Sequence, residues 1–250
     1  MTLFGYKLPM ATSLILWAIL WEIVGRLDLV SLIPPLSHVL LRLEEIVPTE
    51  TFLDALALTA RAFALGTAIA IVTGVPAGVL MGRSEAFDRL LLPWVNVFVS
   101  APLTALVPVI MALFGFGETT IVLTVFLFAV WIIILDARAG ARGISSSLVE
   151  MANSYGATRW QAFSKVYVWA ALPEILAGIR LGLVRAIKGV IIGQLVVSVV
   201  GFGYLFEIYQ SNFLMEHLWA LLLVLFALAF LIDGVFGYLE KRVEYYAAAR

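Results

Sequence analysis

The stretch SLVEMANSYGATRWQ, residues 147–161, is polar and charged in a chain that is otherwise strongly apolar. Ser147 is followed three residues later by Glu150, which is the spacing of a capping box at a helix N-terminus, and the same spacing recurs from Thr158. Gly156 lies between the two pairs, where a left-handed turn that ends a helix costs glycine least. The stretch therefore predicts two short helices joined at a glycine, which we call the polar hairpin.

One face of the first predicted helix is apolar, because four residues recur at helical spacing: Leu148, Met151, Ala152 and Tyr155. An amphipathic helix of this kind, placed between hydrophobic segments, has an apolar side available to another element or another protein. The polar hairpin is thus the part of the chain that we expect to contact another protein. The alternative is a surface hairpin of some other membrane protein.

The same residues carry a resemblance to a known family. Glu150, Met151 and Ala152, followed after three further residues by Gly156, resemble the EAA motif of membrane permease subunits from binding-protein-dependent ABC importers. Residues 108–118 and 172–180 are similar to the branch that handles taurine, nitrate, alkyl or aryl sulfonates and related small organic compounds. In that family the loop docks into a cleft of the ATPase subunit. The resemblance implies a set of coupling residues: Glu150, Met151, Ala152, Tyr155, Gly156 and Arg159.

Two positions depart from the family pattern. Met151 replaces the usual first alanine, and Trp169 stands where proline is common. We expect the helix that begins near Trp169 to start straighter than is usual in the family, without an effect on docking.

Composition independently indicates a membrane protein. Hydrophobic residues make up 63% of the 250 residues, and the mean hydropathy is +1.05. These values exclude a soluble domain. The formal charge of −1 says nothing about nucleic acid, but the sequence lacks the basic cluster that nucleic-acid binding needs. Cysteine is absent, which removes disulfides and thiol chemistry, and neither histidine has a ligand at helical spacing, so we expect no metal site.

Apolar stretches of about 20 residues, the length that crosses a bilayer, recur along the chain. We predict an all-α, polytopic membrane protein with one transmembrane domain over residues 1–250 and a cytoplasmic loop at about 137–168 that contains the polar hairpin. The six expected spans are about 9–26, 54–81, 88–114, 119–136, 169–199 and 217–239.

Basic residues outside the spans predict the orientation. Of the 16 Lys and Arg residues, only Arg26 and Arg42 fall in loops on one side, and ten fall on the other: Lys7, Arg83, Arg89, Arg138, Arg142, Arg159, Lys165, Lys241, Arg242 and Arg250. By the positive-inside rule, both termini and the 137–168 loop are expected in the cytoplasm. An amphipathic run at 38–47 is expected to lie along the outer interface. Residues 200–216 are expected to form an outer lid or a partly re-entrant turn.

Ionisable groups within spans indicate a candidate pathway, because each is costly in hydrocarbon unless it faces water or a partner. Arg185 and Lys188 share one face of the fifth span, and Gln194 lies further along it. In the third span, Pro102 and Pro108 predict a kink that frees backbone carbonyls. The candidate pathway residues are Lys188, Arg185, Gln194, Ser100 and Thr104. The alternative for either cation is an ion pair with Glu22 or Asp233.

The resemblance implies a non-catalytic permease subunit of an ABC importer in a bacterial inner membrane. Its expected partners are a dimer of ATPase subunits, which would bind ATP and Mg, a second copy of the chain and a solute-binding protein. No cofactor and no catalytic residue are expected in this chain. The net-positive pathway favours a small organic anion, such as a sulfonate, nitrate or an aromatic carboxylate. The alternatives are an uncharged heterocycle or vitamin precursor, an intramembrane enzyme, and a structural membrane subunit.

Overall fold

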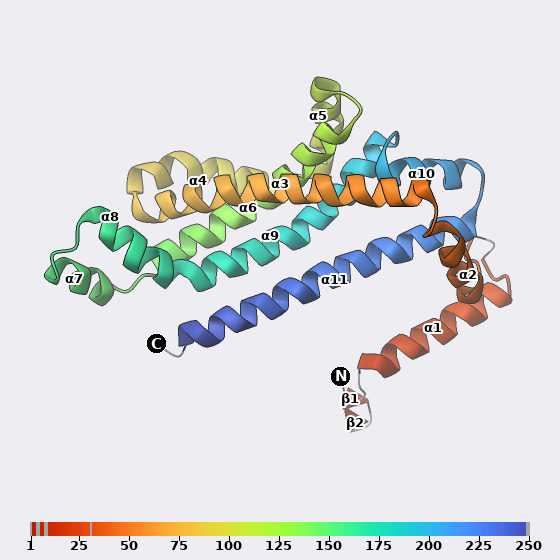
Figure 1. Cartoon of the computed structure of the whole chain (residues 1–250), viewed down its shortest axis with the longest axis horizontal. Coiled ribbons are helices and arrows are strands. Elements are labelled where there is room, and N and C mark those ends of the chain that lie inside the picture. Colours follow the sequence, from red (N-terminus) through yellow and green to blue (C-terminus); the bar gives the residue numbers. More distant parts are fainter. Residues whose placement is uncertain (1, 4–5, 8–9, 31, 249–250) are drawn as a thin grey trace.

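The computed structural model describes residues 2–3, 6–7, 10–30 and 32–248, and it shows an elongated bundle of helices (Figure 1). A short antiparallel pair of strands, β1 (Thr2–Leu3) and β2 (Tyr6–Lys7), precedes the helices. The helical elements are α1 (Met10–Arg26), α2 (Leu36–Ile46), α3 (Glu50–Arg83), α4 (Glu85–Ser100), η1 (Leu103–Leu106), α5 (Val107–Phe114), α6 (Glu118–Arg142), α7 (Ser146–Ser154), α8 (Arg159–Ala162), η2 (Phe163–Tyr167), α9 (Val168–Val197), α10 (Gly201–Ser211) and α11 (Met215–Ala248). The predicted all-α class is confirmed.

Three long helices, α3, α6 and α9, pack side by side at the centre of the bundle (Figure 1). Small residues recur every four positions along α3: Gly66, Ala70, Gly74, Gly78 and Gly82. A Cβ atom added at Gly78 would lie only 2.4 Å from the backbone oxygen of Ile134 on α6. Helices in a bilayer associate through such close contacts, because lipid offers no hydrophobic driving force between them. The small residues therefore determine how closely α3 approaches α6.

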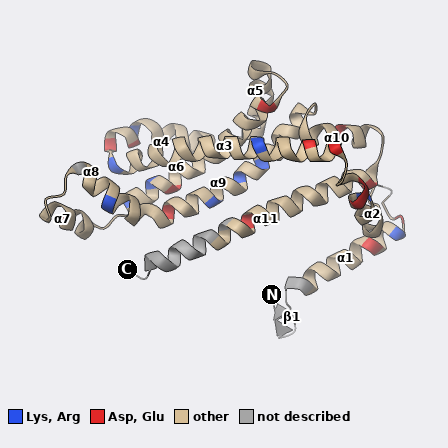
Figure 2. Ribbon diagram, viewed as in Figure 1, with Lys and Arg blue, Asp and Glu red and all other residues tan. Residues whose placement is uncertain are grey.

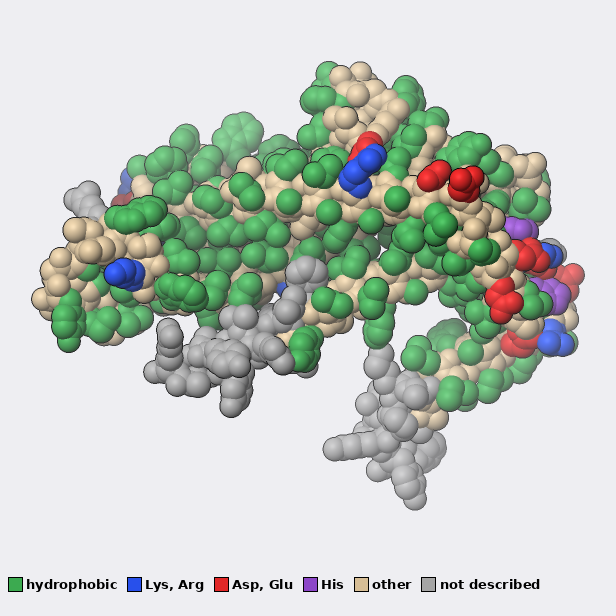
Figure 3. Space-filling model, in the orientation of Figure 1, with side chains coloured by type: hydrophobic (Ala, Val, Ile, Leu, Met, Phe, Trp, Pro, Cys, Tyr) green, Lys and Arg blue, Asp and Glu red, His purple; other side chains and the backbone are tan. Residues whose placement is uncertain are grey.

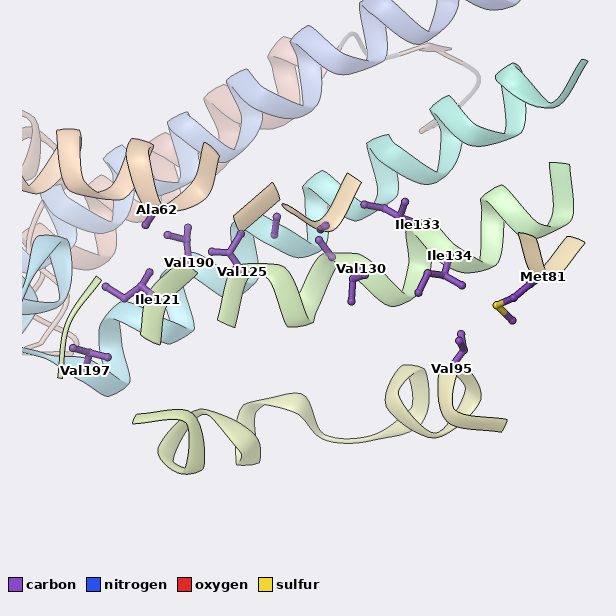
Figure 4. Close-up of a cluster of buried hydrophobic side chains, with 13 residues drawn as sticks. Ala62, Met81, Val95, Ile121, Val125, Val130, Ile133, Ile134, Val190 and Val197 are labelled. Carbon is purple, nitrogen blue, oxygen red and sulfur yellow. The ribbon is translucent and has the colours of Figure 1, made fainter. Parts of the chain in front are cut away.

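The second face of α6 is packed in the same way against α9. A Cβ atom at Gly182 would lie 2.6 Å from the side chain of Ile133, and one at Gly178 would lie 2.5 Å from the Cβ of Asp136. The buried side chains between the three helices come mainly from α6 and include Ile121, Val125 and Ile133 (Figure 4). Helix α6 is thus enclosed by α3 and α9, and this unit is the scaffold on which the other elements rest.

The expected third span, 88–114, is not one continuous helix but a bent pair of helical segments, and that the pair forms a single span stays a prediction. Helix α4 and the η1–α5 segment meet at an angle of 95°. Ala101 precedes Pro102, and the proline ring disfavours the helical conformation for the residue before it. Ala101 accordingly has φ −69° and ψ 146°, which is extended backbone. The predicted kink is therefore a complete break, and it leaves Ser100 and Thr104 on either side of the corner.

Three of the described helices are long and apolar enough to cross a membrane: α3, α6 and the Met215–Val235 part of α11. Two bent pairs, α4 with η1–α5 and α8–α9 with α10, bring the number to five if each pair is one span. Helix α1, with 17 residues, is shorter than these. The space-filling view shows hydrophobic side chains along the length of the bundle (Figure 3). A membrane protein of several spans is confirmed, and the count of six stays a prediction.

The expected amphipathic run at 38–47 is a helix, α2, with Val39 and Ile46 buried on its apolar side. Its polar side carries Arg42, whose Nε lies 2.7 Å from Glu216 at the start of α11. The segment at 200–216, expected as an outer lid or a partly re-entrant turn, contains a packed helix, α10, in which Phe202 and Phe206 are buried against α2, α3 and α11. Helix α10 meets the α8–α9 segment at 53°, which agrees with a re-entrant turn, while its place on the outer face stays a prediction. Charged residues lie near both ends of the bundle and also along α3, α6, α9 and α11 (Figure 2).

Candidate functional site

The polar hairpin is formed by α7 and α8 at one end of the bundle (Figure 1). Gly156 has φ +68°, the left-handed conformation that glycine adopts at least cost. The backbone N–H of Gly156 donates to the oxygen of Asn153 (2.9 Å), and that of Ala157 donates to the oxygen of Ala152 (3.0 Å). These two bonds form a Schellman motif, which ends α7. The predicted helix–glycine–helix hairpin is confirmed.

Of the two predicted capping boxes, only the second forms. The backbone N–H of Thr158 donates to Oε1 of Gln161 (2.9 Å), and the backbone N–H of Gln161 donates to Oγ1 of Thr158 (3.3 Å). The first prediction is wrong, because α7 begins at Ser146 and Ser147 is already inside the helix. Its hydroxyl lies 3.1 Å from that of Ser145 instead. Glu150 is exposed and free to contact another protein.

Large apolar side chains protrude from this polar segment. Met151 is 44% exposed, Tyr155 84% and Trp160 73%, whereas Ala152 is buried. A cluster of exposed apolar residues on an otherwise polar element marks an interaction surface. Arg159 begins α8, but its side chain lies outside the described residues. Met151 and Tyr155 of the predicted coupling set are thus exposed on the surface, whereas Ala152 is buried.

A buried acidic residue that the sequence analysis missed lies near the same end of the bundle. Asp88 of α4 accepts hydrogen bonds from the Nε and Nη2 of Arg138 on α6, and Nη2 of Arg142 lies 3.1 Å from its second oxygen. This cluster joins α4 to α6. The signal in the sequence is an acid in the first turn of an apolar helix, together with two arginines spaced four apart on another helix.

The candidate pathway cations lie on α9. Lys188 is exposed, and no ion pair joins it to another residue within the described parts of the chain. The predicted alternative, pairing with Glu22 or Asp233, is wrong for Lys188. Glu22 bonds to Arg26 at 2.6 Å and accepts from Ser37, and Asp233 is 3.4 Å from Arg180. Both acids therefore have other partners.

Arg185 is half-buried and lies within electrostatic range of Asp136 on α6. Its charge is therefore partly offset, and Lys188 is the more available of the two cations. Ser100 and Thr104 are exposed at the corner between α4 and η1. No hydrogen bond among the described residues joins them to Lys188.

Gln194 does not line an open surface. Its side chain is 2% exposed, and its Nε2 donates to the Oγ1 of Thr59 at 2.7 Å. Thr59 in turn donates to the backbone oxygen of Ala55. A buried amide requires such a partner, and this bond joins α9 to α3. The prediction that Gln194 lines the pathway is corrected: it belongs to the packing of the helices.

Among the described residues, no three His, Asp or Glu side chains gather as a metal site requires.

Residues 74–245 match the family described as "Binding-protein-dependent transport system inner membrane component". The match covers more than half of the chain. The chain belongs to this family. It is therefore a membrane-spanning permease subunit of an ABC importer, located in the inner membrane. The matched range includes the polar hairpin, α6 and α9.

The chain is similar to transport permease proteins of two bacteria. The chain is 29% identical over 230 residues to the taurine transport system permease protein TauC of Escherichia coli (strain K12), covering 89% of this chain and 84% of that protein. It is 30% identical over 188 residues to SsuC of Bacillus subtilis (strain 168), which is named as an aliphatic sulfonates transport permease protein, covering 74% of this chain and 68% of that one.

The fold of the family is also seen in a solved structure. An inward-facing structure of the MetNI methionine ABC transporter is similar to this chain with a TM-score of 0.61 and 22% identity, covering 77% of this chain and 94% of that one. This similarity shows the fold of the bundle. The unit of α3, α6 and α9 with the polar hairpin at its end is thus the permease fold.

Proposed function

We propose that this importer subunit carries a small organic anion of the sulfonate type. The observation that carries the proposal is Lys188, an exposed cation within α9 that has no ion-pair partner among the described residues. Placing a cation in the hydrocarbon core of a bilayer costs free energy unless the cation contacts water or an anion. The two relatives named for taurine and aliphatic sulfonates support the same class of solute.

In this proposal the corner between α4 and η1 lies inside the bilayer and supplies polar groups there. Backbone that leaves the helical pattern inside a bilayer is tolerated only where it is enclosed by protein or lines water. The exposed hydroxyls of Ser100 and Thr104 flank this corner. We assign them, with Lys188 and Arg185, to a pathway that two permease copies enclose between them.

The polar hairpin is the contact with the ATPase subunit in this proposal. Its exposed Met151 and Tyr155 provide an apolar surface, and the exposed Glu150 adds charge to it. Arg159 belongs to the same proposed contact by its place in the sequence. The ATPase subunits bind ATP and Mg, and a solute-binding protein delivers the solute to the outer face. This chain then takes part through movement of its helices and performs no covalent chemistry. The hairpin and both termini lie in the cytoplasm in this arrangement.

Lys188→Gln removes the charge while keeping a polar side chain. If Lys188 holds the anion, uptake of labelled taurine, used as the first probe, is expected to fall by roughly tenfold or more, because a hydrogen bond to a charged group contributes about 1.5–3 kcal/mol. Uptake is measured in vesicles that contain the complete transporter, and the melting temperature of the purified complex is measured beside it.

Lys188→Arg is the matched control, since it keeps the positive charge, and it should retain part of the uptake. Because Lys188 has no described ion-pair partner, neither change should lower the melting temperature by much. Normal taurine uptake by a well-assembled Lys188→Gln complex would exclude an anion contact and favour an uncharged solute. Absence of taurine uptake in the unaltered transporter would exclude taurine, and other sulfonates would then be compared.

The orientation can be tested by labelling, since the chain contains no native cysteine. A single cysteine at Thr49 is expected to react with an impermeant thiol reagent in intact cells, whereas one at Ser146 is expected to react only after the cells are opened. Both residues are exposed, at the start of α3 and of α7. Glu50→Cys is a second outer site, because Thr49 also caps α3. If only Ser146→Cys is labelled in intact cells, the orientation is the reverse of the proposed one, and the hairpin cannot contact an ATPase in the cytoplasm.

A further inference from the structure

The helix that connects the polar hairpin to the membrane bundle changes its winding before α9 begins. Helix α8 continues into η2, a π-helical segment, and η2 continues into α9. A π-helical turn is wider than an α-helical one, is rare, and is frequently found at functional sites. Along the chain, η2 is the connection from the hairpin to α9. The straight helix start expected near Trp169 is therefore preceded by an irregular turn.

Two side chains attach this π-helical turn to the bundle. Phe163, at its beginning, packs against the apolar cluster that includes Val79 of α3 and Ala171 of α9. Tyr167, at its end, lies under the guanidinium of Arg83, whose Cζ is 4.3 Å from the centre of the ring. Arg83 is in the last turn of α3. Both ends of η2 are thus held, one by packing and the other by a cation–π contact.

Arg83 makes this contact at a position where a cation is favourable. The C-terminus of a helix carries partial negative charge, which attracts a basic side chain. No ion pair joins Arg83 to an acidic residue within the described ranges, although it is an exposed arginine. The ring of Tyr167 is therefore its described side-chain partner, and this contact links the last turn of α3 directly to the turn that leads into α9.

We propose that Arg83 and Tyr167 are positioning residues for energy coupling: they stiffen η2, so that displacement of the polar hairpin moves α3 and α9 together. This inference rests on the proposed function, in which the hairpin contacts the ATPase. Without the contact, η2 bends and absorbs part of the displacement. ATP hydrolysis then continues with less movement of the bundle, which a purely structural role for the two residues does not predict.

The test uses the complex of the full chain with its ATPase subunit in lipid nanodiscs. A cysteine at Thr104, beside the broken helix, reports on the bundle through its rate of reaction with a maleimide, with and without ATP and vanadate. The hydrolysis of ATP is measured in parallel. Arg83→Gln and Tyr167→Leu remove the contact, whereas Arg83→Lys and Tyr167→Phe keep the cation or the ring. Arg89→Gln is the matched control, because Arg89 lies at the same end and, among the described residues, pairs with Glu85 alone at 2.6 Å.

We expect Arg83→Gln and Tyr167→Leu each to reduce the ATP-induced change in labelling by roughly two- to fivefold, the range that a cation–π contact of ordinary strength implies. The double variant should lose no more than either single one, and the conservative variants and Arg89→Gln should retain most of the change. Unaltered labelling in the two disruptive variants would overturn the inference, and so would failure of both to assemble. If Thr104→Cys in the unaltered background does not respond to ATP, the proposed function fails, and this inference fails with it.

Discussion

Gly78→Ala is expected to lower the free energy of unfolding of the permease by about 1–3 kcal/mol, the usual cost of adding a methyl group to a close-packed interior. The added Cβ would lie 2.4 Å from the backbone oxygen of Ile134 and 2.7 Å from the Cβ of Ala137. Neither atom belongs to a flexible side chain, so α3 and α6 must separate. The melting temperature and the yield of the purified protein measure the loss.

Gly234→Ala is the matched control, because Gly234 also lies within a long helix, α11, but a Cβ there meets no atom within 4 Å. Alanine is the better helix former by up to about 1 kcal/mol, so this change should be neutral or slightly stabilising. Equal melting temperatures for the two variants would show that α3 and α6 are not held together by their small residues.

Gly156→Pro is expected to uncouple the permease from its ATPase, so that the solute-binding protein no longer stimulates ATP hydrolysis. Proline holds φ near −65°, whereas Gly156 has φ +68°. Proline also removes the N–H that bonds to Asn153. The hairpin then cannot close, while the α3–α6–α9 unit is unaffected. We expect the ATP hydrolysis stimulated by the solute-binding protein to fall by roughly tenfold or more, as for the loss of about 1.4 kcal/mol or more from the docked state.

Gly156→Asn tests whether position 156 requires glycine itself or only the left-handed backbone conformation. Asparagine tolerates the left-handed conformation and keeps the N–H, and no atom lies within 4 Å of the added Cβ. It should therefore retain most of the stimulated hydrolysis. Normal stimulation in Gly156→Pro would show that the polar hairpin does not transmit the signal, whereas a protein that does not fold would show that the hairpin is needed for the bundle itself.

Local interactions were predicted correctly where neighbouring residues determine them. The turn at Gly156 and the capping box from Thr158 to Gln161 depend on residues within one or two turns of helix, and both form. The box from Ser147 does not form, because three consecutive serines allow the helix to begin at more than one of them. Ser145 precedes the helix in the structure, and the local pattern did not distinguish it from Ser147.

Interactions between residues far apart in the sequence were not predicted. The buried bond from Gln194 to Thr59 joins residues 135 positions apart, and nothing close to either residue indicates it. Lys188 and Arg185 were predicted as a pair on one helical face, but their environments differ because of Asp136 on another helix. The angle at Ala101 was likewise larger than the prolines alone predicted. Spans and turns are thus determined by residues close together in the sequence, whereas the pathway depends on how the spans pack against one another.

The contacts between the two ends of the chain bear on the order in which it is assembled in the membrane. Trp21 stacks edge-on against Trp219 with ring centres 5.1 Å apart, and the indole N–H of Trp219 donates to the backbone oxygen of Leu32. Arg42 bonds to Glu216, and its two carboxylate partners, Glu45 and Glu216, raise the pKa of its guanidinium above the ordinary value. During synthesis from the N-terminus, the contacts of Trp21, Leu32 and Arg42 with α11 cannot form until α11 has left the ribosome. The central three helices can pair before then, so the packing of α1 and α2 against α11 is completed last.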